Sequence, residues 1–167
     1  FADMVDALAP AKLDYVTTAV PMDSVDALNL SAEGLAFLDG IEHPVMREQA
    51  RDYFVNQAFR RDLYVRGANR LSATERRSRM LNTRFVLMQP TENVASSVTG
   101  PAGAATLQAE IYRPLLNALA DQMYEAKTMQ QLLDAVSPMA YDDLEQAIAI
   151  LVSMGAVAPC QSEAAEA

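Results

Sequence analysis

The sequence predicts an α+β protein, with a small mixed α/β N-terminal part followed by a winged-helix-like C-terminal helical part. Short runs of β-forming residues alternate with helical patterns in the first two thirds of the chain. Three helical patterns and then a short apolar run follow in the last third, which is the order of a winged helix. A content of 51% hydrophobic and 21% charged residues is typical of a folded globular chain.

The N-terminal segments each carry a local signal. The predicted elements are a helix at 1–8, a strand at 13–19, a loop or short helical turn at 22–30, and a helix at 32–38. Pro10 stops the first helix and Pro21 ends the strand. Ser31 is a good N-cap, and Gly40 is a good stop for the helix between them.

Residues 47–84 form an arginine-rich centre in an acidic chain. This stretch holds ten of the thirteen Lys and Arg residues, all of them Arg, and four acidic residues, so its formal charge is +6. The remaining three basic and eighteen acidic residues give −15. We expect the function to lie in this centre or at a surface that it contacts.

A helix is predicted from Pro44, because proline suits the first helical position. Five residues at helical spacing form one apolar stripe on it: Met46, Ala50, Tyr53, Phe54 and Ala58. Glu48 and Asp52 lie four residues apart, and such a like-charge pair is relieved by nearby cations.

A strand follows, because Leu63 and Val65 alternate with three polar residues, Asp62, Tyr64 and Arg66. Ser72 and Glu75 then have the spacing of a capping box at the start of a polar helix. We interpret the arginines of that helix, Arg76, Arg77 and Arg79, as a solvated face or a docking surface.

The rest of the chain predicts a strand at 85–88, a hairpin with a turn at Gly100 to Gly103, three helices and a closing strand at 156–158. The helices begin near Arg113, at Thr128 as a cap, and at Tyr141. We therefore divide the chain into an α+β core at 1–109, a winged-helix-like subdomain at 110–160 and a frayed tail at 161–167.

Composition excludes several classes of function. A net charge of −9 argues against general nucleic-acid affinity. With Cys160 as the single cysteine, His43 as the single histidine and no apolar run near ~20 residues, we expect no metal site, no membrane span and a cytoplasmic location. No strand–GxGxxG–helix pattern or phosphate loop is present, so no cofactor-binding or catalytic residue is predicted.

The segment EQARDYFVNQAFRRDLYVRG, residues 48–67, resembles the signature of the methyltransferase regulatory domain family. That family has an acidic-aromatic helix running into an FR-x-[DT]-L-[FLY]-x-R strand. The matching residues are Glu48, Gln49, Asp52, Tyr53, Phe59, Arg60, Asp62, Leu63, Tyr64 and Arg66.

The resemblance implies a non-catalytic partner for a class I methyltransferase domain in the same polypeptide, with S-adenosylmethionine bound by that other domain. The first residue is Phe rather than Met, so we expect the chain to be part of a longer protein. Expected modes of action are contact with the catalytic domain, contact with a protein substrate, and self-association as a homodimer.

The candidate binding residues are Arg60, Arg61, Asp62, Tyr64 and Arg66. In a strand, all of them except Arg61 share one face, which suits a bidentate clamp on a carboxylate or phosphate. The alternative is an internal network in which Glu48 and Asp52, beside Tyr53, pair with these arginines and lock the helix to the strand.

Two other functions remain open from the sequence. One is a DNA-binding transcriptional regulator built on the winged-helix-like part, although its third helix opens with acidic residues. The other is a free-standing enzyme that uses the Arg, Asp and Tyr face of the strand.

Overall fold

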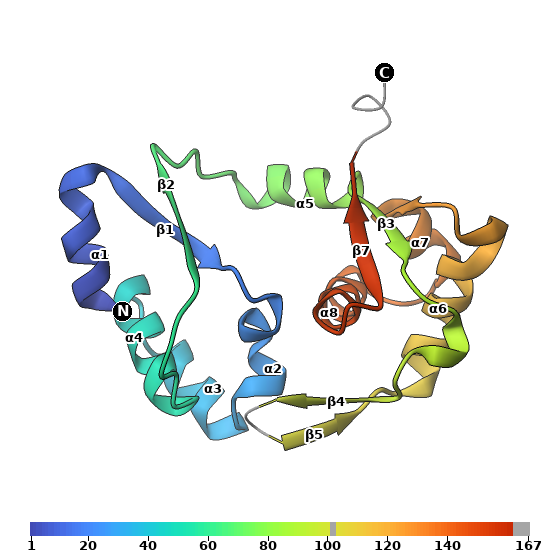
Figure 1. Cartoon of the computed structure of the whole chain (residues 1–167), viewed down its shortest axis with the longest axis horizontal. Helices are drawn as coiled ribbons and strands as arrows, with labels where there is room; N and C mark the ends of the chain where they lie inside the picture. The colour runs from blue at the N-terminus through green and yellow to red at the C-terminus, as the bar shows by residue number, and fades with distance from the viewer. Residues whose placement is uncertain (101–102, 162–167) are drawn as a thin grey trace. The chain divides into compact units, whose positions relative to one another are not determined.

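The computed structural model describes residues 1–100 and 103–161, and it confirms the predicted α+β class (Figure 1). The chain folds as two compact units. Unit 1 comprises Phe1–Arg70 with the described part of 99–105, and unit 2 comprises Leu71–Val98 with residues 106–161.

Unit 1 is built from short helices and one two-stranded sheet. Its elements are α1 (Ala2–Leu8), η1 (Ala9–Ala11), β1 (Leu13–Thr18), η2 (Pro21–Ser24), α2 (Asp26–Asn29), α3 (Ala32–Asp39), α4 (Pro44–Phe54) and β2 (Asp62–Arg66). The predicted caps are confirmed: the Ser31 hydroxyl accepts a hydrogen bond from the backbone N–H of Gly34, and Gly40 ends α3. Pro44 occupies the first turn of α4.

The sheet of unit 1 pairs β1 with β2 in antiparallel register. Tyr15 lies opposite Tyr64, and an irregularity between Tyr15 and Thr17 shifts the pairing by one residue. Helix α1 contacts both β1 and α4, and α3 contacts α4. These contacts set the sheet beside α4, which carries the acidic pair of the sequence signature.

The buried face of α4 is polar. Arg51 and Asp52 are 6% and 8% exposed, whereas Met46, Tyr53 and Phe54 of the predicted apolar stripe are exposed. The stripe is therefore not the face that α4 buries. Ion pairs with residues outside the helix draw its charged side chains inward, and periodicity alone does not contain that information.

Unit 2 combines α-helices with a three-stranded sheet. Its elements are α5 (Ala73–Leu81), β3 (Arg84–Leu87), η3 (Thr91–Asn93), α6 (Ala109–Tyr124), β6 (Lys127–Thr128), α7 (Met129–Ala135), α8 (Tyr141–Ser153) and β7 (Val157–Cys160). The strand order is β6-β3-β7, and both pairings are antiparallel. The largest fully buried side chains of this unit lie on α6, α7, α8 and β7, namely Leu115, Leu119, Met129, Leu132, Leu144, Ile148, Leu151 and Val157.

Local signals place the helix starts of unit 2. Capping boxes form at Ser72 with Glu75 and at Thr128 with Gln131. Helix α6 begins at Ala109, before the predicted start, so Pro114 lies inside the helix rather than in its first turn.

Strands β4 (Ser97–Gly100) and β5 (Gly103–Thr106) pair with each other as the predicted hairpin does. The centre of the predicted turn, residues 101–102, lies outside the described residues. Every residue of the predicted tail beyond 161 does so as well.

The two units do not divide where the sequence analysis divided the chain, at residues 109 and 110. Strand β3 pairs with β6 and β7, and α5 contacts α7, so the segment after Leu71 packs with the C-terminal helices. The winged-helix likeness of this part stays a prediction. None of the described helices has both the length and the hydropathy needed to cross a membrane.

Candidate functional site

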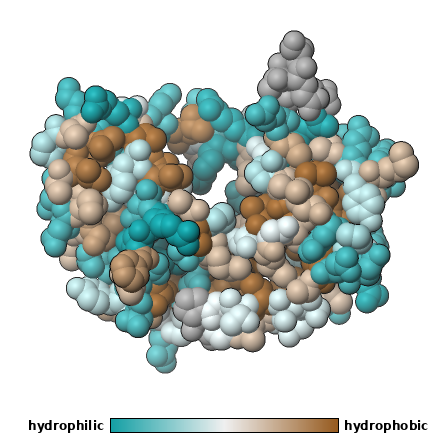
Figure 2. Space-filling view, in the orientation of Figure 1, coloured by the Kyte–Doolittle hydropathy of each residue, from teal (hydrophilic) through white to brown (hydrophobic). Residues whose placement is uncertain are grey.

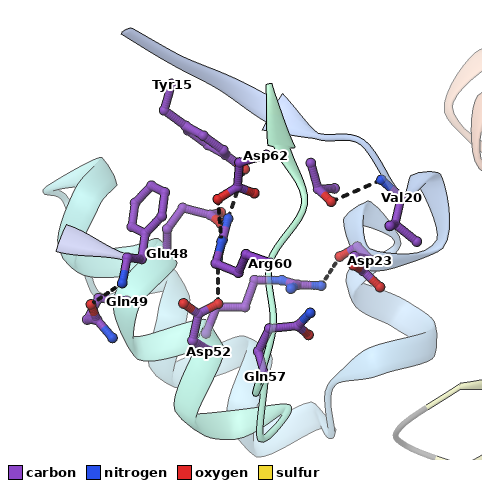
Figure 3. A network of polar contacts seen from close by, with 12 residues as sticks. Tyr15, Val20, Asp23, Glu48, Gln49, Asp52, Gln57, Arg60 and Asp62 are labelled. Carbon is purple, nitrogen blue, oxygen red and sulfur yellow. Dashed lines mark hydrogen bonds and ion pairs between the residues drawn. The ribbon is translucent and has the colours of Figure 1, made fainter. Parts of the chain in front are cut away.

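Arg60 is the centre of a polar network in unit 1 (Figure 3). Its Nε lies 2.8 Å from Oδ2 of Asp62, and its Nη2 lies 3.2 Å from Oε2 of Glu48. Its Nη1 also pairs with Oδ1 of Asp52. Glu48 and Asp52 are one turn apart on α4, so a single guanidinium from the segment before β2 reaches both.

Aromatic rings enclose the same guanidinium. The ring centroids of Phe1 and Tyr15 lie 4.3 and 5.5 Å from the central carbon of the Arg60 guanidinium, which is within cation–π range. Nη2 of Arg60 also donates to the Tyr15 hydroxyl, with a separation of 3.2 Å. Four hydrogen bonds from Nε, Nη1 and Nη2 of this arginine are thus made to groups of unit 1.

The network shifts the pKa values of its members. Burial alone lowers the pKa of Arg60, but hydrogen bonds and charge from Asp62 and Asp52 outweigh burial and raise it. Burial and the negative charge of Glu48 raise the pKa of Tyr15 to about 12, although Arg60 opposes them. Burial and the charge of Asp62 raise the pKa of Tyr64.

A second ion-pair cluster connects α4 to the start of α2. Nε of Arg51 lies 2.8 Å from Oδ1 of Asp26, and Nη2 of Arg47 lies 3.2 Å from Oδ2 of the same carboxylate. Arg51 also donates to the backbone carbonyl of Asp23. The sequence analysis did not assign Asp26 a role. The acid at 26 was the available signal, since a buried arginine requires a charged or polar partner.

The structure brings together some of the predicted site residues and separates others. Arg60 and Asp62 meet Glu48 and Asp52, while Tyr64 lies on the same sheet face with its ring 5.8 Å from that of Tyr15. The predicted residues that lie outside this network are Arg61, Tyr53 and Arg66, all of them exposed.

Glu48 and Asp52 pair with Arg60, as in the internal network described from the sequence, but the other two arginines of that network do not pair with them. Three carboxylates share one guanidinium, so the charge around Arg60 is negative and would repel a carboxylate or phosphate ligand. The negative charge around Arg60 disfavours the predicted anion clamp. Arg61 and Arg66 lie outside the network and do not offset this charge.

Two observations on the described residues bear on metal and cofactor binding. No group of three or more His, Cys, Asp and Glu side chains in that part of the chain could hold a metal ion. The β1–β2 pairing and both pairings of β3 are antiparallel, whereas a Rossmann-type cofactor site needs a parallel strand, a glycine-rich loop and a helix.

Unit 1 is similar to a known protein family. Residues 1–66 match the family model described as a predicted methyltransferase regulatory domain. This match covers α1 through β2 and includes every member of the Arg60 network. The resemblance read from the sequence is confirmed for this part of the chain.

Relatives match over nearly all of the chain. The uncharacterized protein sll1526 of Synechocystis sp. is 32% identical over 163 residues, which are 98% of this chain and 32% of that protein. The fold is similar to that of PKMT2 from Rickettsia typhi, with a TM-score of 0.55, 16% identity, and coverage of 97% of this chain and 36% of that one.

A second PKMT2 structure, in complex with AdoHcy, has a TM-score of 0.55 and 13% identity, and the match covers 97% of this chain and 35% of that one. The chain thus spans about a third of the length of each protein that it matches here. At this identity, the likeness to PKMT2 establishes similarity of fold.

Proposed function

We propose that this chain is a regulatory and substrate-positioning part of an S-adenosylmethionine-dependent methyltransferase. It acts on a catalytic domain of the same polypeptide and does not carry out the transfer. The family match over residues 1–66 supports this proposal. The fold likeness to PKMT2, one structure of which contains AdoHcy, is consistent with it.

The observation that carries the proposal is that unit 1 buries few hydrophobic side chains and exposes many. Among residues whose burial the structure describes, its buried hydrophobic side chains are Val25, Leu30 and Leu38, whereas unit 2 buries seventeen. Of the twelve large hydrophobic side chains that are exposed in this described part of the chain, nine belong to unit 1. A unit of this size with so little core is expected to gain stability from a neighbour.

The outer face of the sheet in unit 1 carries several of these exposed hydrophobic side chains. The side chains of Tyr15, Asp62 and Tyr64 lie on the inner face, and Leu63 and Val65 lie on the outer face, 50% and 41% exposed. Val16 at the strand irregularity is exposed as well. Figure 2 shows hydrophobic surface over the part of unit 1 that contains α1, β1 and β2.

An apolar sheet face of this kind suits contact with another protein surface, because burial of apolar area drives such association. We assign this face to the catalytic domain. Covering it would stabilise unit 1 and hold it in one orientation, which is how a domain without reactive groups can change the activity of its neighbour.

The two alternative functions have less support. Helix α8 begins with the exposed acids Asp142 and Asp143, which would repel DNA phosphates if this helix were a reader of bases. A free-standing enzyme built on the β2 face would need a free Arg60, but its guanidinium is shared by three carboxylates.

Two measurements test the proposal. Calorimetric titration of the 167-residue chain with S-adenosylmethionine should give no binding, and micromolar affinity would overturn it. Methyl transfer by the catalytic domain is then measured with and without the chain. A several-fold change is expected, and an unchanged rate together with no association between the two contradicts the proposed role.

A further inference from the structure

A groove between α1, α4 and β2 joins the acidic network to exposed aromatic side chains. It encloses about 700 Å³ and lies entirely within unit 1. Asp52, Asp62 and Tyr64 are among its polar lining residues, and Met4, Tyr53 and Phe59 are among its apolar ones. We call it the α4–β2 groove.

The groove has unsatisfied acceptors. The side chain of Asp62 is 8% exposed, and its Oδ1 has no hydrogen-bond partner among the described residues. The hydroxyl of Tyr64 is buried without a partner in the same sense. The second carboxylate oxygen of Asp52 makes none of the hydrogen bonds in this network, since Arg60 binds Oδ1. Buried polar groups normally have partners, so Oδ1 of Asp62 and the hydroxyl of Tyr64 indicate a place for a further polar group.

The charge of the groove selects the sign of that donor. Arg60 is its cation, and it is shared by Asp52, Asp62 and the neighbouring Glu48, as Figure 3 shows. The backbone nitrogen of Phe1 donates to Oε1 of Gln49. Residues 1–70 contain seven Lys and Arg against eleven Asp and Glu, which gives −4 and adds a long-range preference for cations.

The rim of the groove suits a cation that has an apolar stem. Tyr53 and Phe59 are 79% and 89% exposed, although aromatic side chains of this size are usually buried. Arg60 shows that this environment accepts a basic side chain, because its guanidinium lies over the ring of Phe1 while its nitrogens bind carboxylates.

We propose that the α4–β2 groove binds a lysine or arginine side chain of a peptide or protein. The charged head pairs with Asp52 in the field of Asp62, and the stem packs against Tyr53 and Phe59. This inference rests on the proposed function and deepens it, because it names the chemical class that the chain would position. The aromatic rim contributes through the stem, so an amine that lacks the stem, such as methylammonium, should bind more weakly than a lysine peptide.

Calorimetric titration with short lysine and arginine peptides tests the inference, using the 167-residue chain. Saturable binding is expected, with a loss of about fivefold for Tyr53→Ala and for Phe59→Ala, because each variant removes apolar contact with the stem. Asp62→Asn should also weaken binding. Matched controls are Phe37→Ala, an exposed aromatic residue on α3, and Asp14→Asn, an exposed acid on β1.

Thermal unfolding shows whether each variant remains folded. Because Tyr53 and Phe59 are exposed, their variants keep the test valid even if Asp62→Asn does not fold. Equal binding of an acetyl-lysine peptide overturns the inference, and so does equal binding of methylammonium, which lacks the stem. No saturable binding has the same consequence. A chain that changes methyl transfer but binds no peptide overturns this inference alone and leaves the proposed function standing.

Discussion

The carboxylate of Asp52 on α4 pairs with the guanidinium of Arg60, eight residues later at the entrance to β2. The two side chains are 10% and 16% exposed, so the pair is largely removed from water. It closes the loop between the helix and the strand, and the same guanidinium holds Asp62 at the first position of β2.

Arg60→Ala should strongly destabilise the chain. The substitution leaves Asp52 and Asp62 as charges without a cation, and loss of one partner of a buried pair costs about 3 kcal/mol. Urea unfolding of the 167-residue chain measures this cost. Arg61→Ala is the control, because Arg61 is exposed, and its cost should stay within about 0.5 kcal/mol. Equal unfolding midpoints for the two variants would contradict the central role of Arg60.

Tyrosine titration should detect the burial of Tyr15. Its pKa is raised to about 12, so between pH 10 and 12 the folded chain retains a proton that the unfolded chain loses. This contribution to stability is present below pH 10 and is lost as the pH rises through about 12.

The tyrosinate absorbance of the folded chain measures this titration when it is followed from about pH 9 to about pH 12.5, a range that begins below the ordinary tyrosine pKa of ~10. Tyr15→Phe should remove a component from its upper end. Tyr53→Phe is the matched control, because Tyr53 is 79% exposed and lies outside the network. A Tyr15→Phe curve that lost only a component near pH 10 would contradict this prediction.

The outer face of β2 should matter for association more than for folding. Leu63→Thr with Val65→Thr places threonine, a β-branched residue that favours strands, at both positions. Both sites are exposed, so the free energy of unfolding should change by less than about 1 kcal/mol. Stimulation of methyl transfer by the chain should fall several-fold, because apolar contact area is removed. Met88→Thr in unit 2 is the control, and an equal loss in that variant would contradict the assignment of this face.

Gly100→Ala should destabilise unit 1 by backbone overlap. A Cβ at this position would lie 2.6 Å from the carbonyl oxygen of Leu28, which cannot move as a flexible side chain can. We expect a cost of about 1–3 kcal/mol in urea unfolding. Gly40→Ala is the control, because its Cβ would meet its nearest neighbour, the Phe37 carbonyl oxygen, at 3.4 Å. A Gly100→Ala chain as stable as the control would show that the backbone adjusts freely.

Local features were predictable because neighbouring residues determine them. The caps at Ser31, Ser72 and Thr128 form as their sequence spacing indicates. The alternation of residues 62–66 correctly predicted a strand with Asp62 and Tyr64 on one face and Leu63 on the other. A short motif was also enough to recognise the family that matches residues 1–66.

By itself, the sequence determined the α+β class, most element positions and the pairing partners available to Arg60. Only the tertiary structure decided which faces are buried, because that depends on residues distant in the chain, as with Arg51 and Asp26. Periodicity shows that a helix or strand has two different faces. Which face is buried depends on which arrangement of the whole unit has the lower free energy. In unit 1, paired charges lie inside, and Leu63 and Val65 are left outside.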